Sequence, residues 1–320
     1  MRAVVAEDKK LIIVDRPSPT PGPGQVVIDV AASAINRADL LQAAGGYPPP
    51  PGASDVLGLE CSGTVSAVGE GVSRVSIGDE VCALLAGGGY AEQVVVAAGQ
   101  VLPVPHGLSL RQAAAIPEVF ATAYLNLYME ARLKPAETVI VHAGASGVGT
   151  AAIQMLQQTN NPVFVTAGSA EKIERCVALG AQGGFDRHQG SFLAAAQAWS
   201  AEGVDVILDP VGAAYLADNL SLLSLNGRLV LIGLMGGIQT ELNLAMMMMK
   251  RLRIIGSTLR ARPIAEKAAV MDELYEQVWP HFVSGAIEPI VEAEFSLDQA
   301  NDAHALIASD TTFGKVLLTV

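Results

Sequence analysis

The stretch "VHAGASGVGTAAIQ", residues 141–154, decides how this chain folds. It follows the apolar run Val139-Ile140-Val141 and leads into a helix-forming sequence from Thr150. A dinucleotide fingerprint, G-x-G-x-x-G, needs its glycines at such a strand-to-helix junction for the tight turn, for backbone approach to the pyrophosphate and for helix packing. Here the pattern is Gly144-x-Ser146-x-x-Gly149, with Ser146 in place of the middle glycine. The stretch therefore predicts a loop that holds phosphate.

A second interpretation makes Ser146 a nucleophile on a sharp turn. The G-x-S-x-G nucleophile elbow also sits between a strand and a helix, but it needs a glycine where this chain has Val148. An acid and a histidine do follow in the required order, as Asp209 and His281, so a serine hydrolase stays a rival. A loop that only turns the chain is the third interpretation.

The residues after the second expected strand indicate which dinucleotide would bind. NAD-binding proteins usually place an acid there for the ribose 2′-hydroxyl, about 20 residues past the first glycine. This chain has Thr166-Ala167-Gly168-Ser169 instead, with Lys172 in the first turn of the next helix. Small residues leave room for a 2′-phosphate, Ser169 can hydrogen-bond to it and Lys172 can supply countercharge. The sequence thus favours NADPH, although Lys172 taken alone is equally typical of a solvated helix residue.

From Thr138 onward, expected strands alternate with expected helices. Such alternation predicts a parallel sheet with helices on both faces, a doubly wound Rossmann-type α/β fold. The expected strands are 138–142, 163–166, 204–208, 228–232 and 253–258, and the expected helices are 150–158, 170–179 and 215–223.

The first hundred residues have a different sequence pattern. Short runs of β-forming residues alternate with clusters of turn-forming residues such as Pro19-Thr20-Pro21-Gly22-Pro23-Gly24. After residue 258 a long helix is expected at 265–282. The final segment, 315–320, is again apolar and strand-like, which predicts its return to the β-rich part. We therefore expect a nucleotide-binding domain at 118–262 and a second domain made from 1–117 and 263–320. A length of 320 residues, of which 51% are hydrophobic, suffices for two such cores.

Charge and composition exclude several classes of protein. A net charge of −12 would repel a nucleic-acid backbone. We expect neither a secretory signal in residues 1–8 nor a membrane span, so a cytoplasmic location is the expectation. Three scattered cysteines are too few for a disulfide framework. The run Met246–Met249 is expected to pack in the core.

In its motifs the chain resembles the medium-chain dehydrogenase/reductase superfamily, which pairs a Rossmann domain with a β-rich GroES-like domain. More narrowly, it is similar to the zeta-crystallin-like NADPH:quinone oxidoreductases, especially the branch of the mammalian stress-inducible enzyme. The segments that carry the resemblance are "AASAINRADLLQAAGGYPPPPGASDVLGLECSG", "ALLAGGGYAEQVVV", "QAAAIPE", "VHAGASGVGTAAIQ", "TAGSAEK", "LMGG" and "FGKVLL". They span nearly the whole chain in order.

Zinc-using relatives carry a cysteine where this chain has Asn36, and a G-H-E triplet where it has Gly58-Leu59-Glu60. The four cysteines of their structural zinc lobe have no counterpart near residues 85–110. We therefore expect no metal. The chemistry would depend on the nicotinamide, with the protein supplying orientation and hydrogen bonds to developing oxyanion charge.

The resemblance also implies the site. Asn36 and Tyr47 would line the acceptor pocket, each able to donate a hydrogen bond to a quinone or enone oxygen, and Thr122 would approach the nicotinamide. Without the resemblance, Tyr47 would be interpreted as a packing aromatic and Asn36 as an amide that caps a turn. The residues implied to bind the cofactor are Thr122, Ser146, Gly147, Val148, Gly149, Gly168, Ser169, Lys172, Gly233, Met235, Phe313, Gly314 and Lys315. Arg187 either strengthens phosphate binding or points into solvent, and the sequence leaves that choice open.

The sequence hypothesis is an NADPH-dependent, metal-free reductase of quinones. An enoyl or alkenal reductase on the same scaffold is the first alternative. An NADPH-binding structural or sensor protein with little turnover is the second. The resemblance further implies a homodimer, with strand pairing near Arg253–Thr258.

Overall fold

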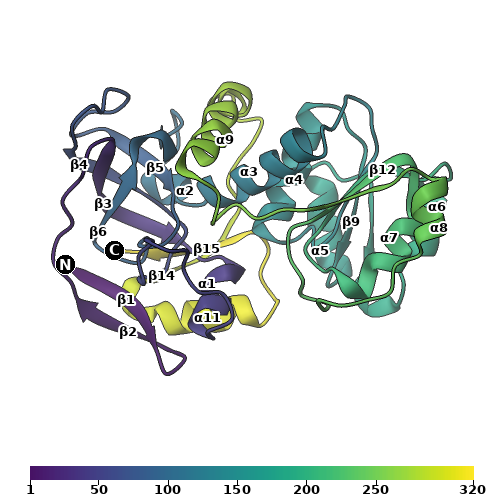
Figure 1. Ribbon diagram of the computed structural model, residues 1–320, viewed down its shortest axis with the longest axis horizontal. Helices are drawn as coiled ribbons and strands as arrows, with labels where there is room; N and C mark the ends of the chain where they lie inside the picture. Colours follow the sequence, from purple (N-terminus) through teal and green to yellow (C-terminus); the bar gives the residue numbers. More distant parts are fainter. The chain divides into compact units, whose positions relative to one another are not determined.

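The computed structural model describes residues 1–320 and divides into two units (Figure 1). Unit 1 comprises Met1–Ala121 and Leu259–Val320, and unit 2 comprises Thr122–Thr258. Both ends of the chain therefore lie in unit 1. The first division falls inside helix α3 (Pro117–Tyr124), which runs directly into a π-helical turn, η2 (Leu125–Glu130).

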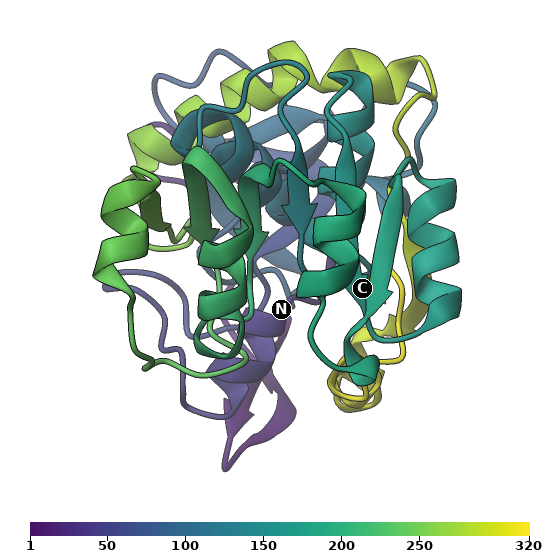
Figure 2. The ribbon, with the colours of Figure 1, turned by 90° about the vertical axis from the view of Figure 1, so that its right-hand side faces the viewer.

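Unit 2 is a six-stranded parallel sheet in the order β10-β9-β8-β11-β12-β13 (Figure 2). Numbered along the unit, this is the 3-2-1-4-5-6 order of a doubly wound dinucleotide-binding fold. The predicted fold class is confirmed in this half. The strands are β8 (Val139–Val141), β9 (Val163–Ala167), β10 (Gly183–Asp186), β11 (Val204–Asp209), β12 (Leu223–Leu231) and β13 (Arg253–Gly256). The helices are α4 (Gly147–Gln158), α5 (Ala170–Ala178), α6 (Leu193–Trp199), α7 (Leu216–Leu222) and α8 (Leu244–Met249), with short turns η3 (Arg187–Gln189) and η4 (Ala213–Tyr215).

Three features of unit 2 differ from the sequence expectation. Helix α4 begins at Gly147 and not at Thr150, because Ser146 caps it and both glycines lie in its first turn. Strand β12 begins at Leu223, five residues before the apolar run that predicted it. Strand β10 and helices α6 and α8 were not predicted, because their short sequences carry little periodicity.

The expectation that the methionine run packs in the core is half wrong. Met246 and Met247 pack against the core of unit 2, but Met248 and Met249 are 78% and 75% exposed. Helix α8 is only six residues long and touches the unit along one face, so consecutive residues cannot all be buried.

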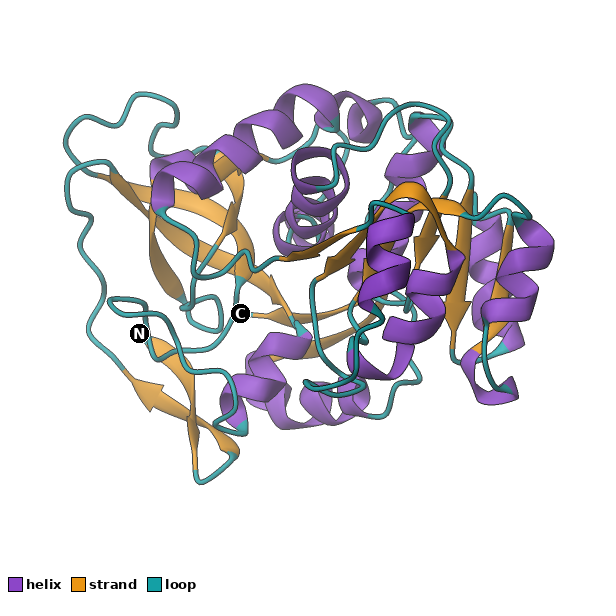
Figure 3. Ribbon diagram, turned by 45° about the vertical axis from the view of Figure 1, so that its right-hand side comes forward, coloured by secondary structure: helices purple, strands orange, loops and turns teal.

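Unit 1 is mostly β-structure, as Figure 3 shows by the density of strands in it. A seven-stranded sheet has the order β14-β15-β3-β4-β5-β7, with β6 also paired to β3, and β1 and β2 form a separate antiparallel ribbon. Pairing is antiparallel except between β14 and β15. The strands are β1 (Arg2–Glu7), β2 (Lys10–Asp15), β3 (Gln25–Ala34), β4 (Glu60–Val68), β5 (Glu80–Leu84), β6 (Gln93–Ala97), β7 (Val101–Pro103), β14 (Val291–Ser296) and β15 (Lys315–Thr319). The closing strand β15 pairs with β3, so the end of the chain does return to the first part.

The helices of unit 1 are short and pack around this sheet. They are α1 (Arg37–Ala43), α2 (Leu110–Ala113), α9 (Ile264–Gln277), α10 (Trp279–Val283) and α11 (Ala300–Ala308), with turns η1 (Ala98–Gln100) and η5 (Leu297–Gln299). Helix α11 lies against β14 and β15, and α9 lies against η1 and β7. The single long helix expected at 265–282 is divided at Val278, next to Pro280 at the start of α10. None of the helices is long and apolar enough to cross a membrane.

Candidate active site

The glycine loop joins β8 to α4 in unit 2. The backbone N–H of Gly149 donates to Ser146 Oγ at 3.0 Å, which caps the helix. A side chain at Gly149 would place its Cβ 2.5 Å from the carbonyl oxygens of both Ala143 and Gly144, so only glycine lets the loop close on the helix. The N–H groups of Gly147 and Val148 open the helix, where no acceptor precedes them within it. Open N–H groups of this kind at a helix N-terminus are chemically suited to an anion.

The same geometry argues against the nucleophile interpretation. Ser146 has ordinary extended backbone angles, φ −73° and ψ 165°, and not the strained turn of an elbow. Its hydroxyl oxygen is engaged as the helix cap. Asp209, the acid that would complete a triad, accepts hydrogen bonds from the backbone N–H groups of Val211 and Gly212 and is buried.

A chain of buried hydrogen bonds joins the loops at the carboxyl ends of β8, β9 and β11. His142 contacts Thr166 Oγ1 at 3.0 Å through Nδ1 and Asn219 Oδ1 at 2.8 Å through Nε2, and Asn219 Nδ2 donates to Asp209 Oδ2 at 2.9 Å. Burial lowers the pKa of His142 to about 4, so the ring is neutral, and burial raises the pKa of Asp209 to about 6. The Thr166 hydroxyl also accepts from the N–H of Ala143, which begins the glycine loop.

Sequence reasoning missed this layer: it left His142, Thr166 and Asn219 without a role. The only available signal was a histidine directly after a buried strand, and that pattern is too common to be diagnostic. In this row of hydrogen bonds both ring nitrogens of His142 and both polar atoms of the Asn219 amide have partners. The row therefore holds the three loops in fixed positions.

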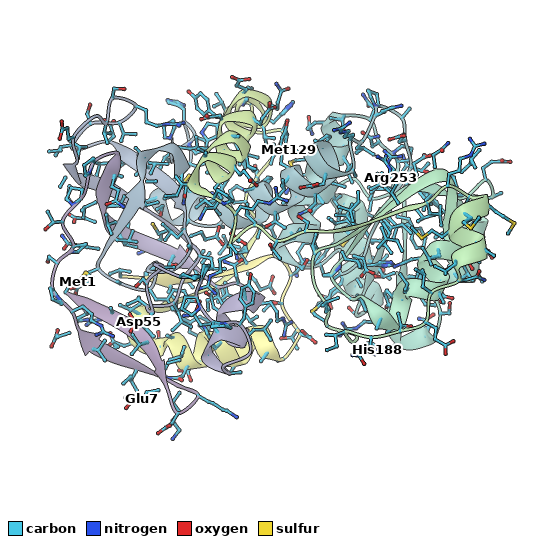
Figure 4. All side chains as sticks on the ribbon, viewed as in Figure 1. Met1, Glu7, Asp55, Met129, His188 and Arg253 are labelled. Carbon is cyan, nitrogen blue, oxygen red and sulfur yellow. The ribbon has the colours of Figure 1, made fainter.

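The residues predicted to hold a 2′-phosphate, Gly168, Ser169 and Lys172, follow β9, and Arg187 follows β10. Ser169 Oγ caps α5 by accepting from the N–H of Lys172 at 3.2 Å. The Arg187 guanidinium reaches back toward Gly168, since a Cβ added there would lie 3.7 Å from its Nε and Nη2. The Arg187 side chain thus lies beside Gly168, and its contact with a phosphate stays a prediction. Figure 4 marks His188, the residue after Arg187, at this end of the unit.

Gly233 and Met235 lie in the loop after β12, next to the turn that follows β11. Met235 N–H donates to Pro210 O at 3.1 Å, and a Cβ on Gly233 would lie 2.9 Å from the same oxygen. The loop after β12 therefore packs against the turn after β11. The Met235 side chain is about half exposed. Thr122, the first residue of unit 2, accepts from Asn126 Nδ2 at 2.7 Å through its carbonyl oxygen.

In unit 1, Asn36 is brought together with Glu60 and Lys315. Lys315 Nζ lies 2.8 Å from Glu60 Oε1 and donates to Asn36 Oδ1 at 2.7 Å and to Ile35 O at 2.6 Å. Asn36 Nδ2 donates to Glu60 Oε1 at 2.9 Å and to Ala34 O at 3.2 Å. Both side chains of the ion pair are buried, Lys315 to 4% and Glu60 to 0% exposure.

This network changes two of the predicted roles. Both amide N–H groups of Asn36 already have acceptors, so none is spare for an acceptor oxygen. The Lys315 ammonium is fully engaged by three oxygens inside unit 1, and so it does not extend toward a cofactor. Phe313 is buried, and Gly314, at φ +88°, has no room for a Cβ beside Ile290 O.

Tyr47 lies under the guanidinium of Arg260, whose Cζ is 5.2 Å from the centre of the ring. Arg260 is itself held by Ala86 O at 2.8 Å and by Gln42 Oε1 at 2.5 Å. Burial, followed by the charge of Glu118, raises the pKa of Tyr47, which keeps its hydroxyl protonated and able to donate. Arg260 and Glu118 were missed by sequence reasoning because no local spacing links them to Tyr47.

No group of three or more histidine, cysteine, aspartate or glutamate side chains is placed to hold a metal ion. The positively charged group that contacts Asn36 is the Lys315 ammonium, which donates to Asn36 Oδ1. The three cysteines are buried and unpaired.

Known proteins identify the family. Residues 22–106 match the model of the alcohol dehydrogenase GroES-like domain, and residues 147–276 match that of the zinc-binding dehydrogenases. The chain is 32% identical to rat quinone oxidoreductase-like protein 2, over 99% of this chain and 91% of that protein. It is also 32% identical to the rat synaptic vesicle membrane protein VAT-1 homolog, over 97% of this chain and 80% of that protein.

Among solved structures, the quinone oxidoreductase of Thermus thermophilus, studied alone and in complex with NADPH, has a TM-score of 0.85 at 31% identity, with all of both chains covered. The chain therefore belongs to the medium-chain dehydrogenase/reductase superfamily, a superfamily of oxidoreductases. Its relatives within the superfamily include quinone oxidoreductase-like proteins and a quinone oxidoreductase. The predicted GroES-like and Rossmann architecture is confirmed. The predicted cytoplasmic location stays a prediction.

Proposed function

We propose that this protein is an NADPH-dependent reductase that passes hydride to quinones without a metal ion. The observation that carries the proposal is the pairing, in unit 2, of two helix starts: the glycine loop capped by Ser146, and the start of α5, where Ser169 is the cap, Lys172 is in the first turn and the Arg187 guanidinium lies beside Gly168. The first suits a pyrophosphate, and the second suits the extra phosphate that distinguishes NADPH from NADH. The structure of the Thermus relative with NADPH supports the same choice of cofactor.

The residues present fit this cofactor. Gly149 leaves open a cradle that a Cβ would fill, and the N–H groups of Gly147 and Val148 open the helix beside it. We assign the pyrophosphate to Ser146, Gly147, Val148 and Gly149, and the nicotinamide end to Thr122 and the loop of Gly233 and Met235. When bound, the reduced nicotinamide supplies the hydride.

On the acceptor side, we assign the hydrogen-bond donor to the Tyr47 hydroxyl. Its raised pKa keeps the O–H in place, and the Arg260 guanidinium above the ring adds positive charge where an oxyanion would develop. Asn36 orients Glu60 and Lys315 in this proposal and does not touch the acceptor. The Lys315 ammonium, held on Asn36 and Glu60, supports a metal-free site because it already supplies the local positive charge.

Loss of NADPH absorbance in the presence of a simple quinone tests the proposal. We expect turnover that persists after metal ions are stripped from the protein with a chelator. Turnover with 2-enones or alkenals but with no quinone would assign the enoyl reductase alternative. Tight NADPH binding with no acceptor-dependent oxidation would instead indicate a binding protein.

Cofactor preference gives a sharper prediction. Replacing Lys172 or Arg187 with alanine is expected to weaken NADPH binding about 10- to 100-fold, the loss of one charge-assisted hydrogen bond, and to leave NADH binding nearly unchanged. Fluorescence titration of each nucleotide measures both constants. Arg175→Ala, in the last turn of the same helix α5, removes the same charge and is the matched control. Equal losses for NADPH and NADH would remove the 2′-phosphate role.

We further propose a homodimer formed through β13. This strand pairs only with β12, so its other edge is open, and Arg253 marks its start in Figure 4. Ser257 N–H donates to Leu231 O of β12, and N–H groups alternate in direction along a strand, so the Gly256 N–H points to the open edge. Gly256→Pro deletes that donor and is expected to yield monomers in sedimentation velocity. Gly256→Ala keeps the donor, has open space for its Cβ and is expected to remain dimeric. A proline variant that stays dimeric would rule out pairing at this edge.

A further inference from the structure

Glu118 is a half-buried acid that the proposed function does not use. It lies in the first turn of α3, four residues before Thr122, so the two side chains share one face of that helix. Its Oε2 is shut off from solvent and has no hydrogen-bond partner. An unpartnered buried carboxylate oxygen costs free energy, and in a native protein such an atom calls for an explanation, such as a catalytic role or an ordered water.

The charges around Glu118 come from every neighbouring element. Glu60 on β4 and Asp39 on α1 repel its negative charge, and Lys315 on β15 and Arg260 attract it. Lys267 on α9 and Tyr47 are the other titrating groups that it faces. The strongest effect is burial, and together these raise the pKa of Glu118 to about 8.

Hydrogen bonds distinguish Glu118 from its neighbour Glu60. Glu60 Oε1 receives Lys315 and Asn36, and Glu60 Oε2 accepts the backbone N–H of Glu118 at 2.8 Å. Three donors stabilise the charged form of Glu60, and Glu118 Oε2 has no donor at all. The missing donor at Glu118 Oε2, together with burial, favours the neutral form of the Glu118 carboxyl group.

We propose that Glu118 is the proton store of the acceptor site, a neutral carboxylic acid that resupplies the proton that Tyr47 donates to the reduced acceptor. The proposal rests on the proposed function. The Glu118 carboxylate raises the pKa of Tyr47 and Arg260 lowers it, so the acid, the phenol and the guanidinium form one electrostatic unit.

The acceptor gains a hydride, which is two electrons and one proton, and becomes an oxyanion. The Tyr47 O–H bond breaks and its proton forms the new O–H bond of the product. The O–H bond of Glu118 then breaks, its proton passes through an ordered water to the Tyr47 oxygen, and the electron pair stays on the carboxylate. A proton from solvent restores Glu118.

The pH dependence of turnover tests this store. Glu118 acts after the product forms, and only its protonated form can resupply, so kcat is expected to be level at neutral pH and to fall as the pH rises through about 8. Glu118→Gln keeps the size and shape of the side chain but releases no proton, so it should lower kcat about 100-fold or more and abolish the break in kcat near pH 8. Glu118→Asp keeps an acid and should restore part of the rate. Glu70→Gln, at an exposed position, makes the same chemical change and should behave as the wild type.

Infrared difference spectroscopy across the same pH range gives a readout without turnover. The carbonyl band of one protonated carboxylic acid should vanish near pH 8 in the wild type and be missing in Glu118→Gln. The proposal would be overturned if the turnover rate of Glu118→Gln were within about twofold of the wild-type rate and still fell near pH 8. It would also be overturned if the wild-type protein showed no carbonyl band of a protonated carboxylic acid. Absence of turnover with every acceptor would refute the proposed function, whereas the infrared titration would still decide whether Glu118 holds a proton.

Discussion

Lys315→Met is expected to destabilise the protein by about 3–5 kcal/mol, the usual cost of removing one partner of a buried ion pair. The ammonium lies 2.8 Å from Glu60, which is fully buried, and also engages Asn36 and Ile35. Methionine fills a similar volume but leaves the Glu60 carboxylate without its cation. Urea unfolding followed by tryptophan fluorescence measures the loss, because Trp279 lies in unit 1.

Two further variants separate the charge effect from packing. Glu60→Gln added to Lys315→Met removes the stranded charge and should recover a large part of the stability. Asp298→Ala, which breaks the exposed pair with Arg2, should cost less than about 1 kcal/mol. If Lys315→Met were as mild as Asp298→Ala, the buried network would not be what stabilises unit 1.

Gly149→Ala is expected to weaken NADPH binding on the order of 100-fold, because displacing binding groups by about 1 Å commonly costs that much. The added Cβ would lie 2.5 Å from the carbonyl oxygens of Ala143 and Gly144, so either the loop or the start of α4 must move. Overpacking of this kind also costs about 1–3 kcal/mol in stability. NADPH titration by fluorescence measures the binding change.

Gly256→Ala is the matched control, since its Cβ meets nothing within 4 Å. It should bind NADPH as the wild type does. Unchanged NADPH affinity in Gly149→Ala would show that the cofactor does not depend on this loop, and it would remove the main support for the proposed site.

Much of the fold follows from local sequence. The glycine loop and the alternation of apolar strands with helices predict unit 2, because a buried parallel strand must be apolar and a right-handed crossover needs a helix. Strand β10 escaped prediction because Gly183-Gly184-Phe185-Asp186 has no strand-like alternation, and only pairing with β9 makes it a strand.

The cofactor half of the candidate site is also local. Ser146, Gly149, Ser169 and Lys172 lie in the first turns of helices that follow strands, so the chain order alone places them at one edge of the sheet. Arg187 needed the structure, since its direction toward Gly168 depends on how β10 lies beside β9.

What the sequence by itself determined is therefore the architecture, the family resemblance and the glycine loop, because these depend on periodicity and on turns a few residues long. What only the tertiary structure decided is the chemistry of unit 1. Lys315 comes from the last strand and meets Asn36 and Glu60 from the first hundred residues. That meeting occupies the amide of Asn36 and gives Glu60 its cation, and Glu118 donates its backbone N–H to Glu60 while its own Oε2 has no hydrogen-bond partner. Charges buried together set one another's protonation, and no spacing along the chain encodes which of them meet.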